Sequence, residues 1–187
     1  MKKYLKASKN KGDEMEQKRI LLILPCMPWV KYNGNVWKSK SWEYVRNKIR
    51  NWLDFVDIYA IDCIRLKSSN KIIGLWSPFK HEYILEEILK EKLDSYPSWN
   101  KYKNHPELRE ELKEEVRKKL LSLKSQYARI ISVVNVKVYY NCLKEISEEF
   151  NIIVLPRVID WRKPYASFYQ GVEELVSEIQ KYGQPLK

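Results

Sequence analysis

Short apolar runs alternate with longer amphipathic stretches along the chain. Residues 20–24 form a continuous apolar run, which is typical of a strand that is covered on both faces. The same kind of pattern predicts four further strands, at residues 56–61, 71–76, 129–134 and 152–155. Apolar positions at helical spacing predict helices that begin near residues 41 and 77 and helices over 104–125, 138–150 and 168–182.

Apolar strands that alternate with amphipathic helices are typical of an α/β fold. We expect a three-layer, Rossmann-like arrangement with a mostly parallel sheet and helices on both faces. The charged helix at about 104–125 is expected to be an excursion from this core, because its apolar positions form only a narrow stripe: Leu108, Leu112, Val116 and Leu120. Residues 19–187 are predicted to be one domain, preceded by a flexible basic segment over residues 1–18.

Composition excludes several classes of protein. No apolar run approaches the roughly 20 residues of a membrane span, and no apolar stretch follows the N-terminal lysines, so we expect a cytoplasmic protein without a membrane partner. Three scattered cysteines and two histidines make a zinc site or a disulfide framework improbable, and no metal is expected. The glycine-rich loops of NAD and P-loop proteins are absent, so no cofactor is expected.

The net charge of +11 at pH 7 is the feature of the composition that says most about possible partners. An excess of this size favours polyanionic partners, and nucleic acid is the commonest of these. The alternative is a solvated surface rich in both Lys and Glu, such as proteins from hot environments carry. In that case the charge says nothing about a partner.

Ligands of open α/β sheets bind beyond the carboxyl ends of the strands, and this rule selects the candidate residues. Polar side chains with catalytic chemistry there are Cys26, Lys31, Ser77 and Asp160. Side chains that can stack on a base or hold it and its phosphate are Trp29, Tyr32, Trp76, Asn135, Arg157 and Trp161. Each has a plainer interpretation: Cys26 as an inert buried thiol, Trp29 as a hydrophobic cap of the sheet, and Asp160 as a turn residue or a partner of Arg157.

Three segments carry a resemblance to a known family: LLILPCMPWVKYNGNVWKSKSW, IIGLWSP and ISVVNVKVYYNCLKEI. Together they resemble the α/β domain of archaeosine synthases and their small stand-alone relatives, over roughly residues 19–160 without the charged helix. Pro25 and Cys26 match directly, and Lys31 and Tyr32 match after a one-residue shift. The chain departs from the family where the family has a histidine, since Trp42 follows Ser41. The resemblance implies a ligand related to a modified guanine in tRNA, to which archaeosine synthases add lysine.

Two hypotheses of function remain open, and a third is weaker. The first is a nucleic-acid-associated protein, such as a relative of base-modifying transferases, that binds or modifies a purine-like (deazaguanine-type) base in tRNA or DNA. It requires Cys26, Lys31, Ser77 and Asn135 to converge in one pocket. The second is a non-catalytic protein whose basic segment and helix 107–124 contact nucleic acid, a protein partner or a second copy of the chain. A nucleotide or sugar-phosphate enzyme is disfavoured by the lack of glycine loops.

Overall fold

A single five-stranded sheet organises the chain. The computed structural model describes residues 19–26, 30–90 and 105–182, and the strands lie in the order β3-β2-β1-β4-β5. β1 (Ile20–Pro25) pairs in parallel with β2 (Val56–Arg65) and with β4 (Arg129–Val133), and β4 pairs in parallel with β5 (Ile152–Leu155). Of these five described strands, only β3 (Ile72–Trp76) runs antiparallel, beside β2. The α/β class and the mostly parallel sheet predicted from the sequence are therefore confirmed.

The central strand β1 is buried along its whole length. Its alternate side chains enter two apolar clusters: Leu22 and Leu24 enter one, and Leu21 and Ile23 enter the other. Because successive side chains of a strand point to opposite faces, a strand with no polar position must be covered on both sides. The continuous apolar pattern at residues 20–24 has this structural cause.

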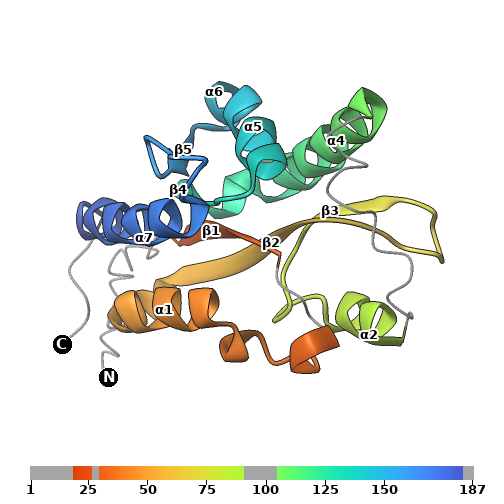
Figure 1. The fold of residues 1–187 in the computed structure, drawn as a ribbon, viewed down its shortest axis with the longest axis horizontal. Helices are drawn as coiled ribbons and strands as arrows, with labels where there is room; N and C mark the ends of the chain where they lie inside the picture. Colours follow the sequence, from red (N-terminus) through yellow and green to blue (C-terminus); the bar gives the residue numbers. More distant parts are fainter. Residues whose placement is uncertain (1–18, 27–29, 91–104, 183–187) are drawn as a thin grey trace, which may run out of the picture.

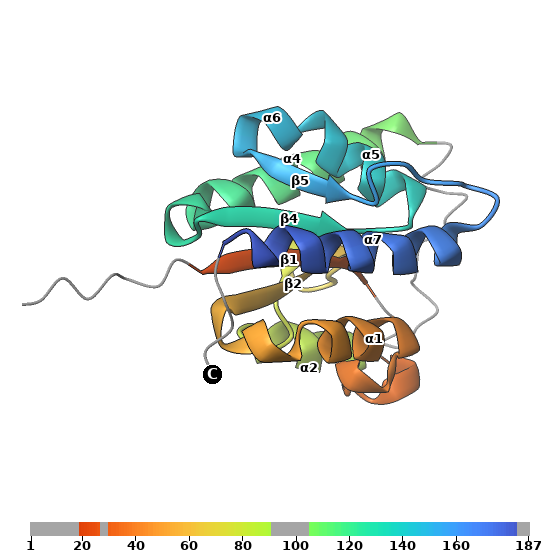
Figure 2. The same cartoon turned by 90° about the vertical axis from the view of Figure 1, so that its left-hand side faces the viewer.

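Helices cover each face of the sheet (Figures 1 and 2). The first cluster contains buried side chains of α1 (Lys40–Lys48) and α7 (Pro164–Gln180), and the second contains those of α4 (Pro106–Leu123), α5 (Lys137–Glu145) and α6 (Ser147–Phe150). α2 (Glu82–Lys90) follows β3 and adds Ile88 to the first cluster. In Figure 2, α7 crosses in front of the strands and α4 lies behind them.

Helix α4 is part of the core, so the expectation of an outlying excursion was wrong. Leu112, Val116 and Leu120 are completely buried in the second cluster. The close approach of α4 to β3 depends on Gly74, whose φ is +72°. A Cβ atom at this position would lie 3.0 Å from Cβ of Glu115 and 3.1 Å from the backbone N of Val116. A narrow apolar stripe is sufficient here because glycine lets the helix backbone contact the strand directly.

Several element boundaries differ from the predicted ones. The segment after Ser77 makes a turn first, and its helix α2 starts only at Glu82. The helix predicted over 138–150 is divided into α5 and α6 around Ile146. The final helix α7 begins at Pro164, earlier than predicted, because proline is well suited to the first helical turn. Within the described residues, no helix is long and apolar enough to cross a membrane.

Candidate functional site

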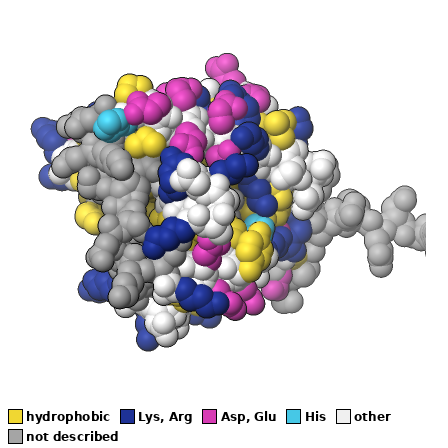
Figure 3. All heavy atoms as spheres, turned by 90° about the vertical axis from the view of Figure 1, so that its right-hand side faces the viewer, with side chains coloured by type: hydrophobic (Ala, Val, Ile, Leu, Met, Phe, Trp, Pro, Cys, Tyr) yellow, Lys and Arg dark blue, Asp and Glu magenta, His cyan; other side chains and the backbone are white. Residues whose placement is uncertain are grey.

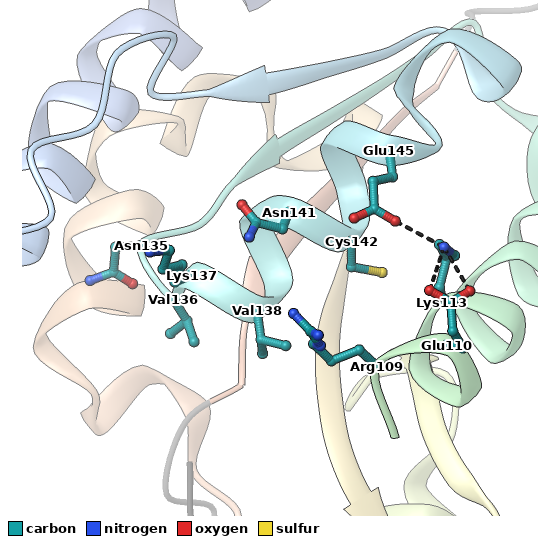
Figure 4. Close-up of a pocket in the computed structure, with 10 residues that line it drawn as sticks. All are labelled: Arg109, Glu110, Lys113, Asn135, Val136, Lys137, Val138, Asn141, Cys142 and Glu145. Atoms are coloured by element: carbon teal, nitrogen blue, oxygen red, sulfur yellow. Dashed lines mark hydrogen bonds and ion pairs between the residues drawn. The ribbon is translucent and has the colours of Figure 1, made fainter. Parts of the chain in front are cut away.

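A cavity of about 640 Å³ lies between the N-terminal half of α4 and α5 (Figure 4). From α4 it is lined by Arg109, Glu110 and Lys113, and from the β4–α5 connection and α5 by Asn135, Val136, Lys137, Val138, Asn141, Cys142 and Glu145. Asn135 follows the carboxyl end of β4 by two residues. The cavity therefore lies at the edge of the sheet where open α/β proteins bind ligands.

The polar lining of this α4–α5 pocket has an excess of positive charge. Lys113 is neutralised by two carboxylates, with Nζ–O distances of 2.8 Å to Glu110 and 2.9 Å to Glu145. Arg109 and Lys137 form no ion pair with any residue that the structure describes. Both side chains are exposed, so a phosphate can reach them without first displacing a protein carboxylate.

An aromatic pair lies next to the pocket. The rings of Tyr140 and Trp161 make an edge-to-face contact with their centroids 5.5 Å apart. The hydroxyl of Tyr140 donates to the backbone carbonyl of Pro156 at 3.2 Å, which fixes the orientation of its ring. Trp161 is 37% exposed, and Nζ of Lys137 lies 6.0 Å from its ring centroid. The indole therefore offers an open surface for stacking beside a cation that also lines the pocket.

Cys26 lies in a different environment, behind α5. Its Sγ is 3.0 Å from the hydroxyl of the completely buried Tyr139, and that hydroxyl is 3.3 Å from Sγ of Cys63. Burial raises the pKa of the Cys26 thiol well above its ordinary value, and the nearby Asp62 and Cys63 raise it further. The thiolate is the nucleophilic form of cysteine, so the thiol of Cys26 is inert at neutral pH.

Ser77 does not lie at the same edge of the sheet as Cys26. Cys26 follows β1, which is parallel to β2, whereas Ser77 follows β3, which is antiparallel to β2. In the register of the sheet, Pro25 pairs with Ile61 and Trp76 pairs with Ala60. With about 3.3 Å per residue along a strand and about 4.8 Å between strands, the register separates Ser77 from Cys26 by roughly 10 Å along the strands and roughly 10 Å across them. This contradicts the expectation that Cys26, Lys31, Ser77 and Asn135 converge in one pocket.

Two of the aromatic candidates belong to the core or its margin. Trp76 is completely buried, so neither face of its indole is open to a base. Tyr32 packs against the first apolar cluster, and the exposed Lys31 lies over its ring at 5.6 Å. The lining of the α4–α5 pocket includes none of these three residues. Trp29 lies outside the described residues.

The candidates that follow β5 are divided between structural and exposed roles. Arg157 pairs with Glu178 near the end of α7 at 2.6 Å. Asp160 accepts hydrogen bonds from the backbone N–H and the guanidinium of Arg162, at 2.9 and 3.1 Å, and these bonds lower its pKa. Asp160 is therefore an ionised turn residue, and its partner is Arg162, not Arg157. Of this group only Trp161 lies next to the pocket, through Lys137.

Sequence reasoning missed the pocket's cations. Lys137 and Tyr140 were detectable, because residues 137, 140, 141 and 144 share one face of a helix that begins just after β4. Arg109 was missed because its helix was assigned to an excursion. A helix that returns across the sheet must begin near the carboxyl ends of the strands if it ends where β4 starts. That topological rule identifies Arg109 once α4 is placed in the core.

The charges of α4 are mostly compensated within the fold. Arg117 pairs with Glu114 and with Glu149 of α6, and Lys118 pairs with Glu115. Figure 3 shows a similar mixture on one face of the molecule, where Lys and Arg side chains lie among Asp and Glu. The net charge of +11 is therefore not gathered along helix 107–124, which weakens its assignment as a nucleic-acid-binding surface.

Comparison with known proteins adds no assignment: no family model, no curated protein and no solved structure matches this chain. Among the described residues, no group of three or more His, Cys, Asp and Glu side chains is arranged to hold a metal ion.

Proposed function

We propose that this chain binds nucleic acid and holds one unpaired, purine-like base and its phosphate at the α4–α5 pocket. The base stacks on Trp161 or enters the pocket beside Asn135, and its phosphate contacts Arg109 and Lys137. In a three-layer, Rossmann-like arrangement, to which we assign this fold, the pocket occupies the usual ligand-binding edge. Its volume of about 640 Å³ is within the range of roughly 300–1,000 Å³ that is common for small-ligand sites.

One observation carries the proposal: Arg109 and Lys137, two cations without carboxylate partners among the described residues, line the same pocket, and Lys137 also lies beside the exposed indole of Trp161. Lys137 is common to both parts, because it lines the pocket and lies over Trp161. Stacking is worth about 1–3 kcal/mol per base and tolerates any base, while phosphate contacts supply affinity that depends on salt. Proteins that bind single-stranded nucleic acid commonly combine such cations with exposed aromatic side chains.

The preference for a purine has two supports. The amides of Asn135 and Asn141 line the pocket, and an Asn amide can hydrogen bond in bidentate fashion to the edge of adenine. The resemblance to archaeosine synthases adds a guanine derivative in tRNA as a candidate ligand. Binding is better supported than modification of the base, because the thiol of Cys26 is inert and Ser77 lies away from it.

Fluorescence anisotropy with labelled oligonucleotides tests the proposal. We expect single-stranded RNA or DNA to bind more tightly than a duplex of the same sequence, with affinity that falls as salt rises. Arg109→Ala and Lys137→Ala should each weaken binding by about five- to tenfold and make the salt dependence less steep, while Trp161→Ala should weaken binding with little change in that dependence. The matched control is Lys124→Ala, an exposed cation just after the opposite end of α4.

Two outcomes would refute the pocket as the binding site. One is a loss of affinity in Lys124→Ala equal to that in Arg109→Ala, because the effect would then reflect only the net charge. The other is unchanged binding in the double variant Arg109→Ala/Lys137→Ala. That result would favour the non-catalytic alternative in which residues 1–18 or the rest of helix 107–124 contact nucleic acid or a protein partner.

A further inference from the structure

A second cluster with unusual chemistry surrounds His81, which follows β3 and precedes α2. The backbone N–H of Ser77 donates to Nδ1 of His81 at 2.9 Å. On its other side, Nε2 of His81 lies 3.3 Å from Nζ of Lys119 in α4. Ten residues of helix separate Lys119 from Arg109, or about 15 Å along α4, so this cluster is distinct from the α4–α5 pocket.

The contact with Ser77 determines where the imidazole carries its proton. A backbone N–H can only donate, so Nδ1 must present its lone pair. The ring is then neutral, with its hydrogen on Nε2. Burial lowers the pKa of His81, and the charges of Lys119 and Lys80 lower it further, which agrees with this assignment.

The tautomer in turn constrains Lys119. An ammonium group has three donors and no acceptor, so a charged Lys119 would place its N–H groups against the Nε2–H of His81. A neutral amine has one lone pair and can accept from Nε2–H. No carboxylate of the described residues pairs with Lys119, whereas the adjacent Lys118 pairs with Glu115 at 2.7 Å. Burial lowers the pKa of Lys119, in the direction that the hydrogen-bond geometry requires.

The groups around this pair do not restore the missing negative charge. From β2, Tyr59 presents its ring edge-to-face at 5.7 Å from the imidazole, and from α2, Tyr83 does so at 6.0 Å. The nearby Lys80 is held by Asp57, with Nζ 2.6 Å from its carboxylate. That carboxylate is already shared with other donors, so it is not available to Lys119.

We propose that Lys119 is a nucleophilic amine at neutral pH and that this site takes aldehyde or ketone ligands as imines. Nζ attacks the carbonyl carbon, and the π electron pair of the C=O bond moves to the oxygen. Loss of that oxygen as water, with the two amine protons, leaves a C=N bond. The Nε2–H of His81 hydrogen bonds to the oxygen as negative charge develops there, and the ring stays neutral throughout. His81 and Lys119 are both partly exposed, which leaves the amine accessible.

Competitive reductive methylation tests this proposal on the full chain. The protein is treated at pH 7 with formaldehyde below the concentration of its lysines and with cyanoborohydride, and the modified peptides are quantified by mass spectrometry. We expect Lys119 to react at least about tenfold faster than Lys118, because an ordinary lysine with a pKa near 10.4 is almost entirely protonated at pH 7. The variant His81→Gln offers an amide oxygen to Lys119 and should remove the advantage, while His105→Gln should preserve it.

The pH dependence supplies a second readout that needs no variant. From pH 6 to 9 the rate at Lys118 should rise by about tenfold per pH unit, and the rate at Lys119 should rise less steeply, because burial lowers the pKa of its amine. A rate at Lys119 no higher than that at Lys118, or one that rises as steeply with pH, would overturn the proposal. So would an unchanged preference for Lys119 in a folded His81→Gln variant.

Discussion

Asp57 provides the sharpest test of the energetics of this fold. Its carboxylate, with a side chain only 10% exposed, accepts hydrogen bonds from Arg19 at 2.5 and 3.1 Å, from Lys80 at 2.6 Å and from Tyr127 at 2.7 Å. Burial alone would raise the pKa of Asp57, but these hydrogen bonds outweigh burial and lower the pKa from 3.8 to about 2. The network joins β2 to Arg19, which precedes β1, to Lys80 in the turn after β3, and to Tyr127, two residues before β4.

The pKa shift of Asp57 determines how much its hydrogen bonds contribute to the free energy of unfolding. A difference of nearly 2 pKa units corresponds to about 2.5 kcal/mol of stability at neutral pH. Arg19 and Lys80 are nearly half exposed, so solvent screens them and we expect about 1–2 kcal/mol. Because the folded-state pKa lies below the unfolded-state value, this stability is fully present above pH about 4. It is lost as the pH falls through the folded-state pKa of about 2.

The assay compares urea unfolding of the wild type and of Asp57→Asn at pH 7 and at pH 2. Asparagine keeps the shape of the side chain and an acceptor oxygen but cannot ionise. At pH 7 we expect the variant to be less stable by about 1–2 kcal/mol, and at pH 2 we expect most of that difference to vanish. Other carboxylates titrate equally in both proteins and cancel in the comparison. A difference that is as large at pH 2 as at pH 7 would show that Asp57 acts through packing and would refute the electrostatic reasoning.

The remaining predictions concern packing and reactivity. Gly74→Ala should lower the free energy of unfolding by about 2 kcal/mol or more, because Cβ would meet α4 and because φ is +72°; thermal unfolding measures this, and an unchanged melting temperature would contradict the contact with α4. Gly171→Ala should also destabilise, since Cβ would lie 2.9 Å from the backbone N of Pro156; Ala166→Gly, at an exposed helical site, is the control and should cost about 1 kcal/mol. Cys26 should react with iodoacetamide at pH 8 at least about tenfold more slowly in the folded protein than in urea, because burial raises its pKa; equal rates would show an accessible thiolate.

The prediction of the candidate site from the sequence assumed that all the strands are parallel. The rule that strand ends converge holds for parallel strands, and it selected Asn135, which lines the pocket, and Trp161, which lies beside Lys137. For Ser77 it failed, because β3 returns antiparallel to β2. Apolar alternation is the same in either direction, so the pattern at residues 71–76 contains no information about strand direction.

The sequence by itself determined the strands and the faces of the helices, because burial on one or both sides leaves a direct periodic trace in the order of apolar residues. The continuous apolar run at residues 20–24 by itself required a strand that is covered on both faces. Only the tertiary structure decided that α4 belongs to the core, since a contact made possible by Gly74 depends on two segments meeting and not on either pattern alone. The α4–α5 pocket and the pairing of His81 with Lys119 arise in the same way, from residues distant in sequence that the register of the sheet brings together.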